Sequence, residues 1–272
     1  MQAEVPITRW EGDTARESVD SVVVEEPLEI RINGESLTVT MRTPGDDFAL
    51  AAGLLFTEGI IRSADDIGGM AYCTDPDNPH LQNIVNVYLA GDWRPDQERG
   101  RWQRSFMATS SCGLCGKASI EAVRCFAPPI AASDFRVSVG VVRCLSERMR
   151  AAQRVFARTG GLHAAGLFDQ EGALLVLRED VGRHNAVDKL LGAELLAERI
   201  PLSERILMVS GRTSFEIMQK AAVAGAPVVC AVSAPSSLAV QLARELNMTL
   251  IGFLRGDTMN VYAGAERVYS GA

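Results

Sequence analysis

The chain has 272 residues, of which 47% are hydrophobic, and a formal net charge of −7. This apolar content predicts folded domains rather than disorder, and the negative charge argues against nonspecific binding to nucleic acid. No apolar run approaches the roughly 18 residues of a membrane span, and the polar start of the sequence lacks the apolar stretch of a signal peptide. We therefore expect a cytoplasmic protein without a membrane span.

The first part of the chain predicts a small α+β domain over residues 19–105, preceded by a flexible leader over residues 1–18. Apolar residues alternate on both sides of Asn33-Gly34, which predicts a hairpin over residues 29–41. Asn-Gly favours this because both positions of a type I′ turn need positive φ angles.

A helix is expected after this hairpin, with Asp46 as its candidate N-cap, and residues 84–89 read as another strand. Residues 106–133 then predict a mobile loop and linker, because glycine and serine surround Cys112 and Cys115. Such residues leave the backbone free to change shape.

After residue 134, short apolar strands alternate with helices, a rhythm typical of a mixed, mostly parallel sheet covered by helices on its faces. The sequence thus predicts a larger α/β domain over residues 134–272. Its expected strands are residues 163–168, 173–177, 205–210, 227–232 and 249–254, and its expected helices are 145–158, 183–198, 213–224 and 236–247.

Polar segments follow several of these strands. Ligands of open α/β sheets bind beyond the carboxyl ends of the strands, free N–H groups at helix starts favour anions, and arginine suits phosphate. We therefore predict a site for a phosphorylated, nucleotide-containing ligand at the edge of the sheet where these strands end. The candidate residues are Arg183, His184, Asn185, Ser210, Gly211, Arg212, Ser236, Ser237, Arg255, Gly256, Asp257 and Thr258.

Each of these residues also has a structural interpretation. Serine at a helix start usually caps the helix, and a lone arginine is usually solvated or paired. Asp180 and Asp188 could pair with Arg183 and Lys189. The hypothesis of a ligand site depends on the convergence of four segments on one edge.

The cysteine pair Cys112 and Cys115 has several interpretations. A structural zinc site needs four ligands, and the chain has neither a second CxxC nor clustered histidines. A thioredoxin-like redox pair would lie where a helix starts after a strand. The pair could also lie in a loop without a chemical role. A persulfide carrier needs an exposed thiolate on a mobile segment, which the loop offers. Of the other cysteines, Cys125, Cys144 and Cys230 are expected to pack among apolar neighbours, and Cys73 is undecided.

Six motifs in order resemble the FdhD/NarQ family of formate dehydrogenase accessory sulfurtransferases, from about residue 20 to the C-terminus. They are Ser110-Ser111-Cys112-Gly113-Leu114-Cys115-Gly116, Thr159-Gly160-Gly161-Leu162-His163-Ala164-Ala165, the run from Glu179 to Lys189, Ser210-Gly211-Arg212-Thr213-Ser214-Phe215-Glu216, Ala234-Pro235-Ser236-Ser237-Leu238-Ala239 and Gly252-Phe253-Leu254-Arg255-Gly256.

This resemblance implies a function. Such proteins accept persulfide sulfur from a cysteine desulfurase and transfer it to the molybdenum, or tungsten, bis(molybdopterin guanine dinucleotide) cofactor before its insertion into formate dehydrogenase. By this resemblance Cys112 carries the persulfide and Cys115 assists. The segment Phe253, Leu254, Arg255, Gly256, Asp257 and Thr258 matches a region assigned to cofactor binding.

The resemblance also implies a homodimer whose larger domain is a cytidine-deaminase-like αβα sandwich. Zinc deaminases need H-x-E followed by P-C-x-x-C, whereas His163-Ala164-Ala165 lacks the glutamate and the CxxC precedes the histidine. We therefore expect neither zinc nor deamination. The alternative function is that of a non-catalytic chaperone for the molybdenum cofactor, in which the cysteines only assist docking.

Overall fold

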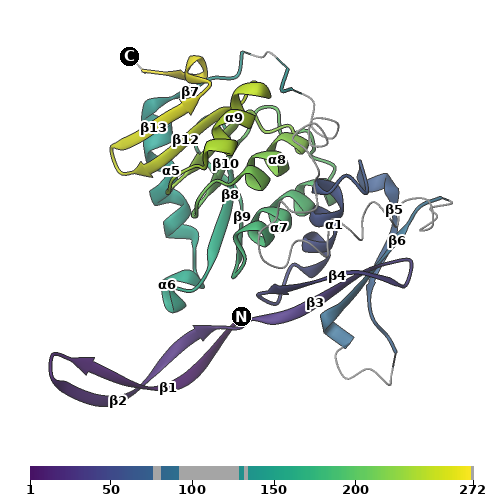
Figure 1. Cartoon of the computed structure of the whole chain (residues 1–272), viewed down its shortest axis with the longest axis vertical. Helices are drawn as coiled ribbons and strands as arrows, with labels where there is room; N and C mark the ends of the chain where they lie inside the picture. The colour runs from purple at the N-terminus through teal and green to yellow at the C-terminus, as the bar shows by residue number, and fades with distance from the viewer. Residues whose placement is uncertain (76–80, 92–128, 132–133, 271–272) are drawn as a thin grey trace.

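The computed structural model describes residues 1–75, 81–91, 129–131 and 134–270. It begins with a long hairpin of β1 (Gln2–Glu11) and β2 (Thr14–Val23), which extends away from the rest of the molecule (Figure 1). The expectation of a flexible leader over residues 1–18 is therefore wrong, because these residues belong to the two strands of the hairpin. The two strands pair along their whole length around a turn at Gly12, whose φ is 60°.

A four-stranded sheet in the order β4-β3-β6-β5 follows the hairpin. Its strands are β3 (Glu26–Ile32), β4 (Glu35–Arg42), β5 (Ile67–Tyr72) and β6 (Ile84–Leu89). The predicted turn between β3 and β4 is confirmed, because Asn33 and Gly34 have φ angles of 50° and 85°. Leu28, Ile30 and Ile32 turn the buried face of this sheet toward helix α1 (Asp47–Thr57).

The larger sheet has six strands in the order β13-β12-β11-β10-β8-β9. The pairs β10–β11 and β11–β12 are parallel, whereas β8–β9, β8–β10 and β12–β13 are antiparallel, so the sheet is mixed and parallel only in its middle. The strands are β8 (His163–Phe168), β9 (Leu174–Asp180), β10 (Ile206–Val209), β11 (Val228–Ala231), β12 (Thr249–Arg255) and β13 (Thr258–Ala263).

Helices cover both faces of this sheet and make three layers (Figure 1). Ile206 and Met208 of β10 pack in the cluster that holds α5 (Val139–Ala152), whereas Leu207 and Val209 pack with α7 (Arg183–Leu196). This alternation follows from the period of two along a strand. The helices α8 (Phe215–Val223) and α9 (Ser237–Glu245) join α7, and the short strands β7 (Val137–Ser138) and β14 (Val268–Tyr269) pair beside α5. The predicted mixed α/β sandwich is confirmed, but the sheet is not mostly parallel, because β8, β9 and β13 each join it through antiparallel pairs. Its detailed likeness to cytidine deaminases stays a prediction.

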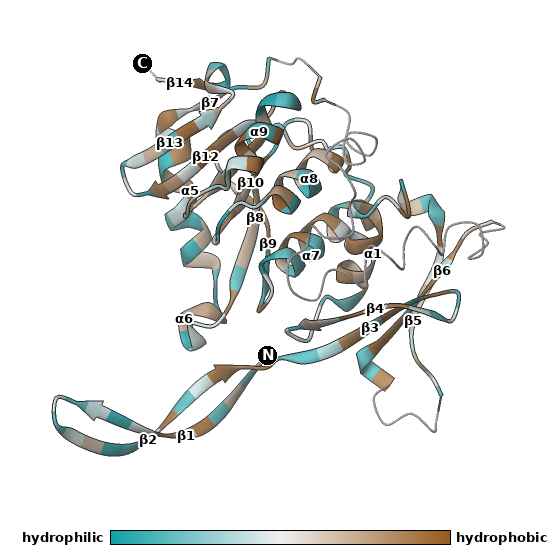
Figure 2. Ribbon diagram, viewed as in Figure 1, coloured by the Kyte–Doolittle hydropathy of each residue, from teal (hydrophilic) through white to brown (hydrophobic). Residues whose placement is uncertain are grey.

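The two predicted domains share one hydrophobic core. Helix α1 packs on α7, and the buried cluster runs from Leu28 and Leu50 through Leu190 to Val229. The two helices touch through glycine, because a Cβ at Gly53 would lie 1.9 Å from the carbonyl oxygen of Asp188. Brown hydrophobic segments line this junction in Figure 2.

Two local predictions need correction. Asp46 precedes α1 in the left-handed region with φ 56° and makes no side-chain cap; its carboxylate instead lies 3.4 Å from Nε of Arg178. The helix expected over residues 145–158 is broken into α5 and α6 (Phe156–Thr159). Glu179 explains the break, because its carboxylate accepts the N–H groups of Val155 and Phe156 at 3.3 and 3.0 Å and so starts a new helix.

Candidate functional site

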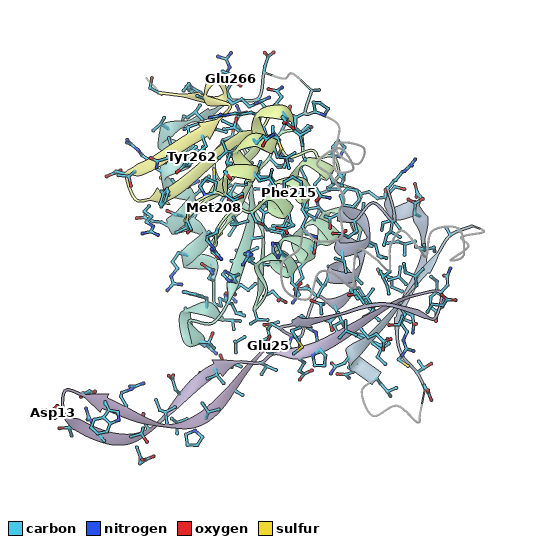
Figure 3. The ribbon with its side chains drawn as sticks, viewed as in Figure 1. Asp13, Glu25, Met208, Phe215, Tyr262 and Glu266 are labelled. Carbon is cyan, nitrogen blue, oxygen red and sulfur yellow. The ribbon has the colours of Figure 1, made fainter. Side chains whose placement is uncertain are left out.

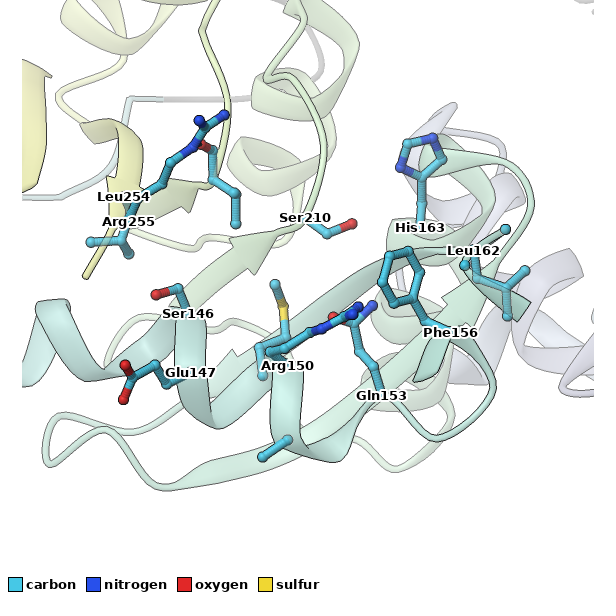
Figure 4. A pocket seen from close by; sticks show the side chains of 15 residues that line it. Ser146, Glu147, Arg150, Gln153, Phe156, Leu162, His163, Ser210, Leu254 and Arg255 are labelled. Atoms are coloured by element: carbon cyan, nitrogen blue, oxygen red, sulfur yellow. The ribbon is translucent and has the colours of Figure 1, made fainter. Parts of the chain in front are cut away.

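A cavity of about 770 Å³ opens at the carboxyl ends of β10, β11 and β12 (Figure 4). This is the edge that the sequence indicated for a ligand. Helices α5 and α6 and the start of β8 form the opposite wall. The lining residues are Ser146, Glu147, Met149, Arg150, Ala151, Gln153, Phe156, Gly160, Gly161, Leu162, His163, Ser210, Val232, Leu254 and Arg255.

Three of the predicted residues line this cavity: Ser210, Leu254 and Arg255. The Oγ atom of Ser210 accepts the N–H of Ala164 at 2.9 Å, which fixes the serine between β10 and β8. Nε of Arg255 donates to the carbonyl of Val232 at 3.3 Å and anchors the guanidinium at the rim.

The backbone of β12 explains why both Leu254 and Arg255 face the cavity. Successive strand residues normally point to opposite faces, but the register with β13 shifts between Gly252 and Arg255. Within this bulge Phe253 has a φ of 52°, a left-handed conformation that is uncommon for an aromatic residue. Bulges are known to re-aim side chains. The predicted Phe253 itself is 40% exposed and does not line the cavity.

His163, at the start of β8, connects the cavity to two more predicted residues. A Cβ on Gly211 would lie 3.3 Å from Nδ1 of His163 and 3.8 Å from Cδ of Arg183, so all three residues are neighbours. Burial lowers the pKa of His163, and the positive charges of Arg183 and His184 lower it further. The imidazole is therefore suited to neutral hydrogen bonding near pH 7.

Nε of Arg183 is buried and has no hydrogen-bond partner among the described residues. A buried donor without an acceptor is costly, so this position suits an anionic or carbonyl oxygen of a ligand. Arg183 is thus free of the ion pair with Asp180 that the structural interpretation considered. Asp180 pairs with Lys189 at 2.7 Å instead.

His184 lies in a separate cluster at the start of α8. Its Nε2 is 3.3 Å from Oγ of Ser214, which donates to Glu216 at 2.7 Å. The hydrogen bond with the His184 ring is the largest cause that lowers the pKa of Glu216 to about 2. The hydrogen bond from Ser214 also lowers this pKa, whereas burial raises it. Oε2 of Glu216 also lies 3.6 Å from Nε2 of His184, so the hydroxyl and the carboxylate approach the same imidazole nitrogen. This is unlike the arrangement of a catalytic triad.

The remaining predicted residues do not converge on the cavity. Nδ2 of Asn185 donates to the carbonyl of Met41 at 2.7 Å and to Asp180 at 3.1 Å, so it holds β4 against α7. Ser236 caps α9 through the N–H of Ala239 at 3.2 Å, which is its structural interpretation. The others, all exposed, are Arg212, Ser237, Gly256, Asp257 and Thr258.

Sequence reasoning missed the wall made by α5 and α6. There the guanidinium carbon of Arg150 lies 3.9 Å from the centre of the Phe156 ring, a cation–π contact. Gln153, 4% exposed, directly follows α5 and also lines the cavity. The motif at residues 159–165 was the available signal, since Gly160 to His163 form one side of the cavity.

The cysteine pair Cys112 and Cys115 lies outside the described residues. Among the described cysteines, Cys73 and Cys230 are buried, and burial raises the pKa of Cys230 to about 12, which makes its thiol inert. Cys144 is exposed on α5, so the expectation that it packs is wrong. The reason is helical phase: Val142, Leu145 and Met149 take the buried face.

Within the described part of the chain, no three His, Cys, Asp or Glu residues are grouped as a metal site would need. In the same residues, no helix is long and apolar enough to cross a membrane. The predicted absence of zinc stays a prediction, because Cys112 and Cys115 are not among the residues searched.

Fold and site together define an αβα protein with a cavity of about 770 Å³ at the edge of its mixed sheet. Residues 23–269 match the model of the FdhD/NarQ family, so the chain belongs to the FdhD/NarQ family.

The similar proteins agree with this assignment. The chain is 55% identical over 259 residues to a protein of Streptomyces avermitilis named sulfur carrier protein FdhD, covering 92% of this chain and 89% of the relative. Over 255 residues it is 52% identical to one of the same name from Mycolicibacterium paratuberculosis, covering 92% of each. A crystal structure described as a formate dehydrogenase accessory protein from Desulfotalea psychrophila matches with a TM-score of 0.77 and 26% identity, covering 98% of this chain and 99% of that one.

Proposed function

We propose that this protein is a sulfur carrier for the maturation of formate dehydrogenase. It accepts persulfide sulfur from a cysteine desulfurase and transfers it to the molybdenum bis(molybdopterin guanine dinucleotide) cofactor before insertion. The observation that carries this proposal is the cavity at the sheet edge with arginine at its rim, in a chain whose relatives are named sulfur carrier proteins.

The chemistry of the cavity fits one nucleotide arm of that cargo. Its volume of about 770 Å³ lies within the ~300–1,000 Å³ of small-molecule sites, which is too little to enclose two dinucleotides. Arg255 and Arg150 offer fork-shaped donors for phosphate. His163 lines the cavity and is a neighbour of Arg183, whose buried Nε has no hydrogen-bond partner among the described residues. We expect the metal end of the cargo to remain outside, within reach of the cysteine segment.

The sulfur steps follow from thiol chemistry. The Cys112 thiolate attacks the outer sulfur of the desulfurase persulfide, whose S–S bond breaks and releases the donor thiolate. Cys112 then carries the persulfide. Attack by the Cys115 thiolate on the inner sulfur would form a Cys112–Cys115 disulfide and release hydrosulfide for the metal. Since free thiols persist in reducing compartments, we expect the protein to act in the cytoplasm.

Sulfur loading is tested by incubating the protein with a cysteine desulfurase and cysteine, followed by peptide mass spectrometry. We expect one added sulfur on the peptide with Cys112, lost in Cys112→Ala and kept in Cys144→Ala. The second variant is the matched control, because Cys144 is an exposed thiol outside the motif. Sulfur that stays in Cys112→Ala would refute the carrier assignment.

Cargo binding is tested separately by calorimetric titration with guanine nucleotides. We expect binding to persist in Cys112→Ala, because the cavity does not need that thiol. Binding without any sulfur loading of the unaltered protein would replace the carrier with the chaperone of the cofactor.

A further inference from the structure

Gln153 carries a buried amide that the fold itself does not use. Only 4% of this residue is exposed, and apolar residues of similar burial, such as Met208 and Phe215, pack between the layers of the sandwich (Figure 3). Gln153 instead lines the cavity, and its side-chain amide makes no hydrogen bond within the part of the chain that the structure describes. A buried amide without a partner is costly, so this group is available to a ligand in the cavity.

The backbone on both sides fixes the position of Gln153. Its N–H donates to the carbonyl of Arg150 in α5 at 3.3 Å, and its carbonyl accepts the N–H of Ala157 in α6 at 3.1 Å. Gln153 thus lies in the turn between the two helices that wall the cavity. Because both backbone groups have partners, the side chain keeps its own donor and its own acceptor for a ligand.

The chemistry of this amide indicates what it binds. A carboxamide presents a carbonyl acceptor beside an NH2 donor, whereas a phosphate offers acceptors alone and would leave the carbonyl oxygen of Gln153 without a partner. The complementary edge is an N–H beside a C=O in one ring. Guanine has this edge on its Watson–Crick side, and a pterin has it too. Since we expect the proposed cargo to keep its pterin with the metal, outside the cavity, guanine is the ring that remains for this wall.

Two further side chains make the same wall suitable for a flat ring. The guanidinium carbon of Arg150 lies 3.9 Å from the centre of the Phe156 ring, and both side chains line the cavity as Gln153 does (Figure 4). Bases bound by proteins stack on aromatic rings and on guanidinium planes. Arg150 can still donate to a phosphate, because stacking uses the face of its guanidinium and leaves the N–H groups at the edge.

We propose that Gln153 binds the Watson–Crick edge of the guanine of the cargo, with its NH2 group donating to the ring carbonyl and its carbonyl accepting the ring N–H. The inference rests on the proposed function for the cargo and adds the residue that reads its base. Arg255 lies on β12, at the other wall, and suits the phosphates. The nucleotide then has its base on the wall of α5 and α6 and its phosphates at the edge of the sheet.

The first test is calorimetric titration of the full chain with guanosine diphosphate, a pterin and inorganic pyrophosphate. Gln153→Met keeps the approximate size of the side chain and removes both of its hydrogen-bonding groups. We expect the dissociation constant for guanosine diphosphate to rise at least about tenfold, whereas the constant for pyrophosphate stays unchanged. Gln241→Met is the matched control, since Gln241 is exposed on α9 and does not line the cavity, and it should change neither constant.

Gln153→Glu gives a second result that a purely structural role would not produce. The amide of glutamine can turn over to fit adenine, but a carboxylate only accepts hydrogen bonds. Guanine offers it two neighbouring donors, whereas adenine offers a ring acceptor. We expect the preference for guanosine over adenosine diphosphate to rise about tenfold or more relative to the unaltered protein. Thermal melting of each variant checks that the fold is kept.

The outcomes separate this inference from the proposed function. Equal binding of guanosine diphosphate by the unaltered protein and Gln153→Met overturns the inference alone, as does an unchanged base preference in Gln153→Glu or a loss confined to the pterin. Absence of binding of every probe by the unaltered protein overturns both the inference and the proposed cargo. Absence of sulfur loading on Cys112, measured separately by mass spectrometry, overturns the carrier and leaves the base site standing.

Discussion

The contact between α1 and α7 makes Gly53→Ala a sharp test of how the two sheets are joined. The new Cβ would lie 1.9 Å from the carbonyl oxygen of Asp188, whereas an ordinary contact begins near 3.4 Å, so the helices must separate by 1.5 Å. The obstacle is backbone, which no rotamer change can remove. Overpacking costs about 1–3 kcal/mol or more, and alanine returns up to about 1 kcal/mol of helix propensity. We therefore expect the free energy of unfolding to fall by about 2 kcal/mol.

Urea unfolding measures this loss as a lower midpoint at unchanged slope. The matched control is Gly140→Ala in α5, because its Cβ would be 3.8 Å from the nearest atom, Oγ of Ser138. There the same change should stabilise by about 0.5–1 kcal/mol. If Gly53→Ala unfolds at or above the midpoint of the unaltered protein, the close helix contact described here is refuted.

Three further perturbations test other parts of the structure. Lys220→Met leaves Asp188 buried without the cation that lies 2.8 Å away, so the unfolding free energy measured in urea should fall by about 3–5 kcal/mol; an unchanged value would contradict the buried pair. Because the folded pKa of Glu216 is about 2 against an ordinary 4.5, its stabilisation is complete above pH 4.5 and is lost as the pH falls toward 2. The stability difference between the unaltered protein and Glu216→Gln should therefore shrink over that range, and a constant difference would argue against the shift. Arg255→Ala should weaken guanine-nucleotide binding about tenfold by calorimetry, whereas Arg212→Ala, outside the cavity, should not; the reverse order would move the site along the edge.

Elements with a strong local pattern were predictable from the sequence. Asn33-Gly34 determines a turn through its own φ preferences, and β8 was expected over the residues it occupies. The edge of the cavity was also predictable, because it depends only on where strands end. The sequence alone thus predicts Ser210 and Arg255 at this edge, and both residues line the cavity.

What could not be predicted depends on contacts between distant segments. Asn185 was expected at the ligand, but its amide is used by Met41 of β4, about 140 positions away in the chain. Asp46 is of a residue type that often caps helices, yet its carboxylate pairs with Arg178 of β9 instead. The hairpin of β1 and β2 was not predicted, because both of its faces mix polar and apolar residues, which hides the alternation of a strand with one buried face.

The single core shared by the two sheets has a consequence for motion. Two lobes that meet through a thin linker can close on a ligand by bending, but here α1 and α7 touch backbone to backbone at Gly53 and Gly192. The buried pair of Asp180 and Lys189 reinforces this junction through the carbonyl of Thr43. This close packing opposes bending between the two sheets, so we expect changes of shape at the cavity to occur in the side chains of its rim.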